Sequence, residues 1–143
     1  MNLRFLNQLD LPGDWPRVEP LLKKVVDKAV HGEYGLDDLR RMAYENRICI
    51  GVMEDAEGMP VLALAFEFID YPSGKKAVNV LATGGSQIDA LMTLFWGRFQ
   101  DWARSQGCDW IECLVSPGME RIHQRYGLKT VYRQMRMVLD KEE

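Results

Sequence analysis

The sequence has few of the residues that build metal centres, disulfide frameworks and membrane spans. It contains only two histidines and three cysteines, Cys49, Cys108 and Cys113. No His, Cys or carboxylate spacing matches a metal site, so we expect no bound metal. The opening MNLRFLNQLD lacks the apolar run of a secretory signal, and an odd cysteine count then indicates reduced thiols in the cytoplasm. No apolar stretch approaches the roughly 18 residues of a membrane helix.

Net charge is also small. The chain has 18 Lys and Arg against 21 Asp and Glu, a formal net charge of −3. Without an excess of positive charge, we expect no non-specific binding to nucleic acid. The 47% hydrophobic and 27% charged residues are typical of a soluble globular protein. The 143 residues contain no internal repeat or low-complexity segment, so we expect a single domain over 1–143.

The hydrophobic pattern alternates between helical and strand-like periods. Apolar residues at helical spacing predict helices over 15–30, 36–46, 87–106 and 118–126. Short apolar or β-branched runs predict strands over 3–9, 47–53, 61–70, 77–83, 109–115 and 128–139. Strands separated by helices near the C-terminus predict an α/β fold, with helices on both faces of a mixed sheet.

Turn and capping residues set the expected boundaries of these elements. Asp14, just before Pro16, is the predicted N-cap of the first helix. Gly84-Gly85-Ser86 is expected to open the long helix, and Ser116-Pro117-Gly118 is expected to cap the last one.

The element order and two short motifs resemble the GNAT (Gcn5-related N-acetyltransferase) superfamily. The run WARSQGCDWIE, residues 102–112, is similar to the family's junction of helix, glycine and strand. RYGL, residues 125–128, is similar to the ending of the family's last helix. Together with Pro117-Gly118, the first run looks most like small GNAT-like proteins encoded in phage and prophage genomes. The resemblance implies an acyl-CoA N-acyltransferase fold with a splayed sheet.

This resemblance implies acetyl-coenzyme A as cofactor, bound where two parallel strands part, with its diphosphate on the N-terminus of the long helix. Counting back from Gly107, the matching loop starts at Gln87, with Ala90 and Met92 at its small-residue positions and Asp89 beside the expected phosphates. In a second alignment Gly84 and Gly85 supply the amides, although a glycine pair is also a common chain reversal. The other cofactor-binding candidates are Leu81, Ala82, Thr83 and Ser116.

For catalysis, the resemblance implies a backbone amide of a bulged strand, a base and an acid. His123 falls at the position of the family's acid. The alternative is that it is a half-exposed helix residue that packs or points to water. Glu67 is the first candidate base, because a carboxylate in an apolar strand is costly unless it is exposed or paired with Lys76 or a nearby Arg. Glu112 is the second candidate base. The acceptor would be a small-molecule or protein amine.

The loop at 87–92 departs from the family's glycine-containing pattern, and this departure favours a second class of function. In this alternative the chain is a GNAT-like phage protein without catalysis, in the virion or host cytoplasm, where it binds a virion or host protein. The basic residues of 120–136 would contact an acidic partner or the 3′-phosphate of coenzyme A, or form a solvated face. Pairing through the final strand would give a homodimer.

Overall fold

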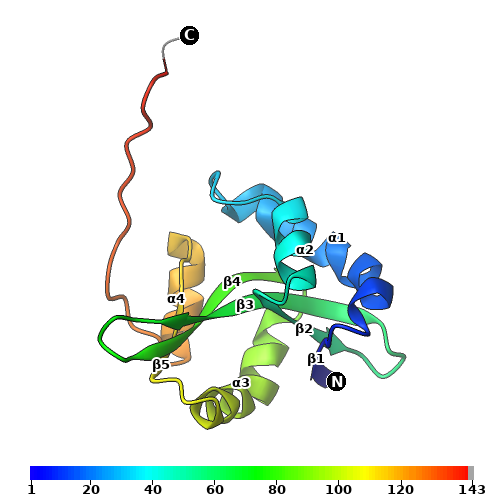
Figure 1. Cartoon of the computed structure of the whole chain (residues 1–143). Coiled ribbons are helices and arrows are strands. Elements are labelled where there is room, and N and C mark those ends of the chain that lie inside the picture. The colour runs from blue at the N-terminus through cyan, green and yellow to red at the C-terminus, as the bar shows by residue number, and fades with distance from the viewer. Residues whose placement is uncertain (142–143) are drawn as a thin grey trace.

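Five strands lie in chain order across one sheet in the computed structural model, which describes residues 1–141 (Figure 1). The strands are β1 (Asn2–Phe5), β2 (Cys49–Glu54), β3 (Pro60–Asp70), β4 (Lys76–Gly85) and β5 (Trp110–Cys113). The helices are α1 (Leu11–Ala29), α2 (Leu36–Tyr44), α3 (Ile88–Ser105) and α4 (Pro117–Arg125). Within the described residues, no helix is long and apolar enough to cross a membrane.

The sheet is mixed. Strands β1 to β4 pair antiparallel with their neighbours, whereas β5 pairs parallel to β4. A parallel pair requires a long crossover connection, and α3 supplies it. Helices α1 and α2 cover one face of the sheet and α3 the other (Figure 1). The expected mixed sheet with helices on both faces is confirmed.

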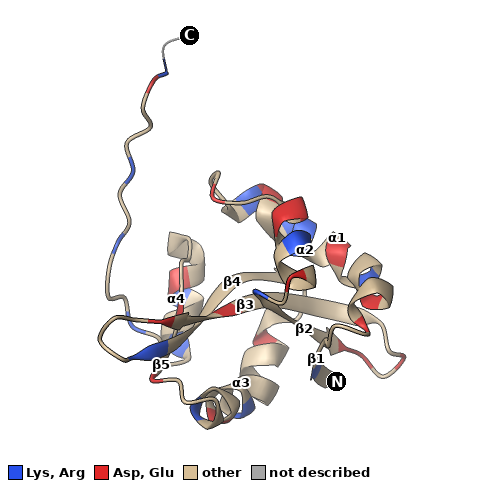
Figure 2. Cartoon of the chain, in the orientation of Figure 1, with Lys and Arg blue, Asp and Glu red and all other residues tan. Residues whose placement is uncertain are grey.

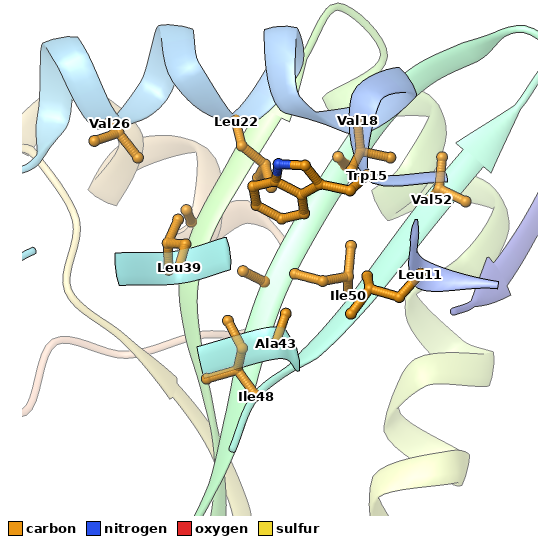
Figure 3. Packing of buried hydrophobic residues seen from close by; sticks show 13 residues of the cluster. Leu11, Trp15, Val18, Leu22, Val26, Leu39, Ala43, Ile48, Ile50 and Val52 are labelled. Carbon is orange, nitrogen blue, oxygen red and sulfur yellow. The ribbon is translucent and has the colours of Figure 1, made fainter. Parts of the chain in front are cut away.

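The core between α1, α2 and the sheet forms because α1 presents an apolar stripe at helical spacing. Trp15, Val18 and Leu22 of this stripe pack against the sheet together with Leu39 of α2 (Figure 3). Alanines on β3 and β4 let the helix approach the strands closely. This core fixes α1 across β3 and β4. Strand β4 leads to the candidate site.

The core beneath α3 is aromatic. Phe66 of β3 is fully buried and meets Phe99 of α3 edge-on, with ring centroids 5.7 Å apart. Trp102 packs on the same phenylalanine at 5.4 Å. Edge-to-face contacts of this kind add to the free energy of apolar burial. They hold α3 firmly against the sheet.

The first helix begins at Leu11, earlier than the expected residue 15, and its N-cap position is Asp10. The prediction that Asp14 is the N-cap is therefore wrong. Its carboxylate instead accepts hydrogen bonds from Arg4 at 3.0 Å and from Arg17 at 2.9 Å. Glu54 of β2 also accepts from Arg4, at 2.7 Å. These ion pairs tie β1, α1 and β2 together.

The glycine pair before α3 belongs to β4, so the prediction that it opens the helix is wrong. Gly84 and Gly85 pair with Ala63 and Leu62 of β3. A Cβ on Gly84 would lie 2.1 Å from the carbonyl oxygen of Leu21 in α1. Gly85 has φ +134°, and its Cβ would lie 2.3 Å from the Val61 carbonyl oxygen. Close backbone packing therefore explains both glycines.

The predicted final strand over 128–139 is also wrong. Residues 128–141 form neither helix nor strand and leave the molecule as a single extended stretch of chain (Figure 1). The sequence pattern identified a segment with strand-forming side chains. A strand also needs a neighbouring strand with which its backbone can form hydrogen bonds. Within residues 1–141 the sheet ends at β5, and residues 128–139 do not pair with it.

Candidate functional site

The two parallel strands part near their carboxyl ends. They pair from Ala77 with Trp110 to Val80 with Cys113. Beyond this point β4 continues to Gly85, whereas the chain after Cys113 leaves the sheet and enters α4. Because the strands are parallel, both carboxyl ends lie at the same edge of the sheet, where α3 and α4 begin. Ligands commonly bind at such an opening between strands.

A β-bulge lies in β4 at the opening. Ala65 of β3 pairs with Ala82, and the next residue of β3, Phe66, pairs with Val80. Leu81 is therefore the extra residue of the bulge. The Tyr34 hydroxyl donates a hydrogen bond to the Leu81 carbonyl oxygen at 2.8 Å. This bond orients the peptide at the point where the strands separate.

An apolar hollow lies on the α3 face of the opening. Its empty volume is about 620 Å³, which includes space open to solvent. Side chains of β4, β5, α3 and α4 line it, among them Val80, Thr83, Cys113, Met119 and His123. Burial raises the pKa of the Cys113 thiol. The thiol therefore stays protonated at neutral pH and serves as a small wall residue rather than a nucleophile.

The start of α3 offers unpaired backbone donors beside the hollow. Gln87 is the N-cap residue, and its side chain makes no capping hydrogen bond. The amide of Leu91 donates to the Gln87 carbonyl oxygen at 2.9 Å, so the amides of 88–90 precede the first intrahelical bond. These amides and the helix dipole favour an anion. Asp89 adds a negative charge to the same turn.

His123 lines the hollow from α4 with a defined orientation. Its Nδ1 lies 2.8 Å from the Met119 carbonyl oxygen. A carbonyl oxygen only accepts, so Nδ1 carries the hydrogen, and Nε2 of the neutral ring is left as an acceptor. In this tautomer Nε2 gains a proton to donate only when the ring is cationic.

Both candidate bases lie on the opposite face of the sheet, in one cross-strand row. Glu67 of β3 pairs with Asn79 of β4, which in turn pairs with Glu112 of β5. The Asn79 amide donates to Glu67 at 3.1 Å, so Glu67 takes this partner rather than Lys76 or an arginine. Glu112 accepts from Tyr71 at one carboxylate oxygen and from Trp110 at the other.

Tyr34 is a site residue that the sequence analysis missed. It lies in the loop between α1 and α2, and its hydroxyl reaches β4 across 47 positions of sequence. Burial, followed by the negative charges of Glu33 and Glu67, raises its pKa. The hydroxyl therefore stays protonated and can donate. In the sequence it is only a tyrosine in a glycine-flanked loop, and this pattern does not predict that its hydroxyl bonds to β4.

The structure thus brings some predicted residues together and separates others. Thr83 and His123 line one hollow, whereas Leu81 and Ala82 face the core beneath α1. Ala90 lies in the first turn of α3. Ser116 is the N-cap of α4, as expected, and accepts from the Met119 amide at 3.4 Å. No group of three potential metal ligands occurs within residues 1–141.

Comparisons with known proteins find this fold among solved structures. No protein-family model and no curated protein sequence matches the chain. Among solved structures, an acetyltransferase from Trypanosoma brucei is similar with a TM-score of 0.68 and 18% identity, over 96% of this chain and 99% of that one.

Two further structures are similar over nearly their whole length. Ribosomal-protein-alanine N-acetyltransferase from Brucella melitensis has a TM-score of 0.72 and 11% identity, over 97% of this chain and 100% of that one. Glucosamine-6-phosphate N-acetyltransferase from Arabidopsis thaliana has a TM-score of 0.66 and 16% identity, over 97% and 98%. At these identities the likeness concerns the fold. The chain has the fold of the GNAT acetyltransferases.

Proposed function

We propose that the chain is an N-acetyltransferase that binds acetyl-coenzyme A in the opening between β4 and β5. The observation that carries the proposal is the coincidence of three features at one sheet edge. Parallel strands part beside a β-bulge, an apolar hollow lies beneath them, and a helix N-terminus with unpaired amides begins there. An elongated ligand with an anionic end and an apolar arm fits this arrangement.

The residues present match the chemical parts of this cofactor. The amides of 88–90 would hold the diphosphate, and Val80, Thr83 and Met119 would contact the less polar arm. A backbone amide at the Leu81 bulge would donate to the thioester carbonyl oxygen. When bound, the cofactor supplies an acetyl group activated for transfer to an amine. Asp89 opposes this fit, since its charge lies in the turn that would receive the diphosphate.

Two side chains would handle protons on the two sides of the opening. The Glu67 carboxylate, half-buried and bonded to Asn79, would accept a proton from the acceptor amine. The amine would approach from the α1 and α2 face, where Glu67 and Glu112 favour a cationic group. We assign the base role to Glu67 rather than Glu112, because both oxygens of Glu112 already accept hydrogen bonds. His123 would donate from Nε2 in its cationic form while Nδ1 stays bonded to Met119.

Calorimetric titration with acetyl-coenzyme A tests the proposal. We expect binding by the unaltered chain and tighter binding by Asp89→Asn, by about twofold to fivefold for the loss of a charge at a helix N-terminus. Gln87→Glu should weaken binding by a similar factor. Asp101→Asn is the matched control, because Asp101 lies near the other end of α3 and pairs with Arg104. No heat at high micromolar cofactor would remove the enzyme proposal.

One observation favours the second class of function, a binding protein without catalysis. Gly84 and Gly85 are occupied by strand pairing and packing, so the turn at the helix start contains only residues with side chains. In this alternative the fold would bind a virion or host protein, in keeping with the phage resemblance of the sequence. Absence of cofactor binding by every variant above would support it.

A further inference from the structure

The cross-strand row of Glu67, Asn79 and Glu112 ends beside two aromatic rings. Trp110 precedes Glu112 by two residues on β5, so both side chains occupy the same face of the sheet. The Tyr71 ring, just after β3, lies 5.5 Å from the Trp110 ring at an angle of 38°. Trp110 is 42% exposed and Tyr71 is half-buried. One end of the row therefore combines a carboxylate with two partly exposed rings.

Glu112 is held in place as an anion. The Tyr71 hydroxyl donates a hydrogen bond to one carboxylate oxygen, and the Trp110 indole donates to the other at 3.1 Å. The bond to Glu112 raises the pKa of Tyr71, so the proton stays on the hydroxyl at neutral pH and the negative charge stays on the carboxylate. An ionised carboxylate has about four acceptor positions. Each oxygen of Glu112 can therefore accept one further hydrogen bond.

No basic side chain of the described residues neutralises the row. The charged residues of β3 and β5 are all acidic, and Lys76 is the one basic residue of β4 (Figure 2). Lys76 is directed to the opposite face, where its Nζ lies 4.7 Å from the centroid of the Phe68 ring and donates to the Gln106 carbonyl oxygen. Within residues 1–141, neither Glu67 nor Glu112 forms an ion pair. The row is therefore free to bind cationic groups of a ligand.

The spacing of the two carboxylates sets the size of such a ligand. Glu67 and Glu112 lie on strands that are separated by β4, so their backbones are about 10 Å apart. A linear diamine with about five carbons between its nitrogens covers this span when each nitrogen adds a hydrogen bond of about 2.8 Å. A monoamine reaches one carboxylate only.

We propose that the acceptor is a linear diamine, with the reacting amine at Glu67 and the second amine, as an ammonium, bound to Glu112 against the Trp110 ring. A carboxylate and aromatic faces together favour an ammonium over a neutral polar group. This inference rests on the proposed function, because the amine at Glu67 is the one that would be acetylated. Binding of the second amine at Glu112 needs no cofactor.

The transfer step balances with the residues already assigned. The reacting nitrogen enters as the free amine and forms a bond to the acetyl carbon, whose bond to sulfur breaks. Glu67 takes the proton that the nitrogen loses, and the thiolate takes a proton from His123. The ammonium at Glu112 keeps its protons and only positions the acceptor.

Amine titrations of the chain without cofactor, followed by the indole N–H signals in NMR, test the second site. The Trp110 signal is identified by its loss in Trp110→Phe. We expect pentane-1,5-diamine to shift this signal and to bind at least about tenfold more tightly than pentan-1-amine, since a hydrogen bond between charged groups is gained. Ethane-1,2-diamine is too short to reach both carboxylates and should bind like the monoamine.

Glu112→Gln should reduce the preference for pentane-1,5-diamine over pentan-1-amine to within about twofold, since the amide has no charge. Glu57→Gln is the matched control, because Glu57 is exposed in the turn between β2 and β3 and its loss should leave the preference unchanged. Equal affinities for the two amines, an unmoved Trp110 signal, or a preference that survives Glu112→Gln would each overturn the inference.

Calorimetry with acetyl-coenzyme A separates this inference from the proposed function. Cofactor binding without a diamine preference would overturn the diamine site and leave the proposed function standing. A diamine preference in a chain that binds no cofactor would overturn the proposed function and support the diamine site.

Discussion

Gly84 is so close to α1 that a methyl group there would lie 2.1 Å from the carbonyl oxygen of Leu21. Gly97, in the middle of α3, has no atom within 4 Å of its Cβ position. The two glycines therefore have opposite consequences when replaced by alanine. One is required by packing between elements, and the other merely weakens its helix.

We predict that Gly84→Ala destabilises the chain by about 3 kcal/mol, because backbone atoms must move to admit the methyl group. Gly97→Ala should stabilise it by about 0.8 kcal/mol, the difference between glycine and alanine in a helix. Urea unfolding of the two variants gives both free energies. Equal effects of the two substitutions would contradict the packing described for β4.

Tyr34 makes a second prediction about a single residue. Tyr34→Phe removes the hydroxyl that donates to the Leu81 carbonyl oxygen at 2.8 Å. We expect a loss of about 1 kcal/mol in the free energy of unfolding and faster amide exchange at the bulge. Tyr44→Phe, on the exposed end of α2, serves as control and should change neither. Unchanged exchange at 80–82 in Tyr34→Phe would show that the hydroxyl does not hold the bulge.

At the scale of elements, an ion-pair cluster joins β1, α1 and β2. Hydrogen bonds from Arg4, the largest cause, lower the pKa of Asp14 and of Glu54 below their usual values of 3.8 and 4.5. The unfolded chain therefore takes up protons at a higher pH than the folded chain. The stability from these groups is complete above about pH 4.5 and is lost as the pH falls through the lowered folded values.

We predict that Arg4→Met lowers the free energy of unfolding at neutral pH and reduces the additional loss between neutral pH and about pH 3. Denaturant unfolding at the two pH values measures both quantities. Arg104→Met is the control, because its pair with Asp101 is largely exposed and such pairs contribute little. The cluster has no role in acid stability if Arg4→Met and the unaltered chain lose the same free energy on acidification.

Elements were predictable from the sequence where local pattern decides them. The helical spacing of apolar residues located α2, α3 and α4 to within about two residues, and the apolar runs located β2, β3 and β4. The errors lie where distant contacts decide. The closeness of Leu21 kept Gly84 in a strand, and residues 128–139 leave the sheet without pairing with the free edge of β5. Neither feature leaves a periodic signal in the sequence.

At the scale of the whole molecule, the site depends on which face of the sheet each side chain occupies. The sequence indicated Glu67 and Glu112 as candidate bases and His123 as candidate acid, without relating their positions to one another. The fold places the two carboxylates in one row on one face and the imidazole in the hollow on the other. Alternation along a strand predicts which face of the sheet a side chain occupies only once the pairing register is known. Tyr34 reaches the site from a loop, where the sequence has no periodic pattern.

The most direct measurement of the central claim is an amide NMR titration with acetyl-coenzyme A. If the cofactor binds where β4 and β5 part, the amides of 80–91 and 116–119 should shift together and saturate at one affinity, whereas those of α2 should stay in place. Shifts confined to other parts of the chain, or no shift at saturating cofactor, would contradict the account.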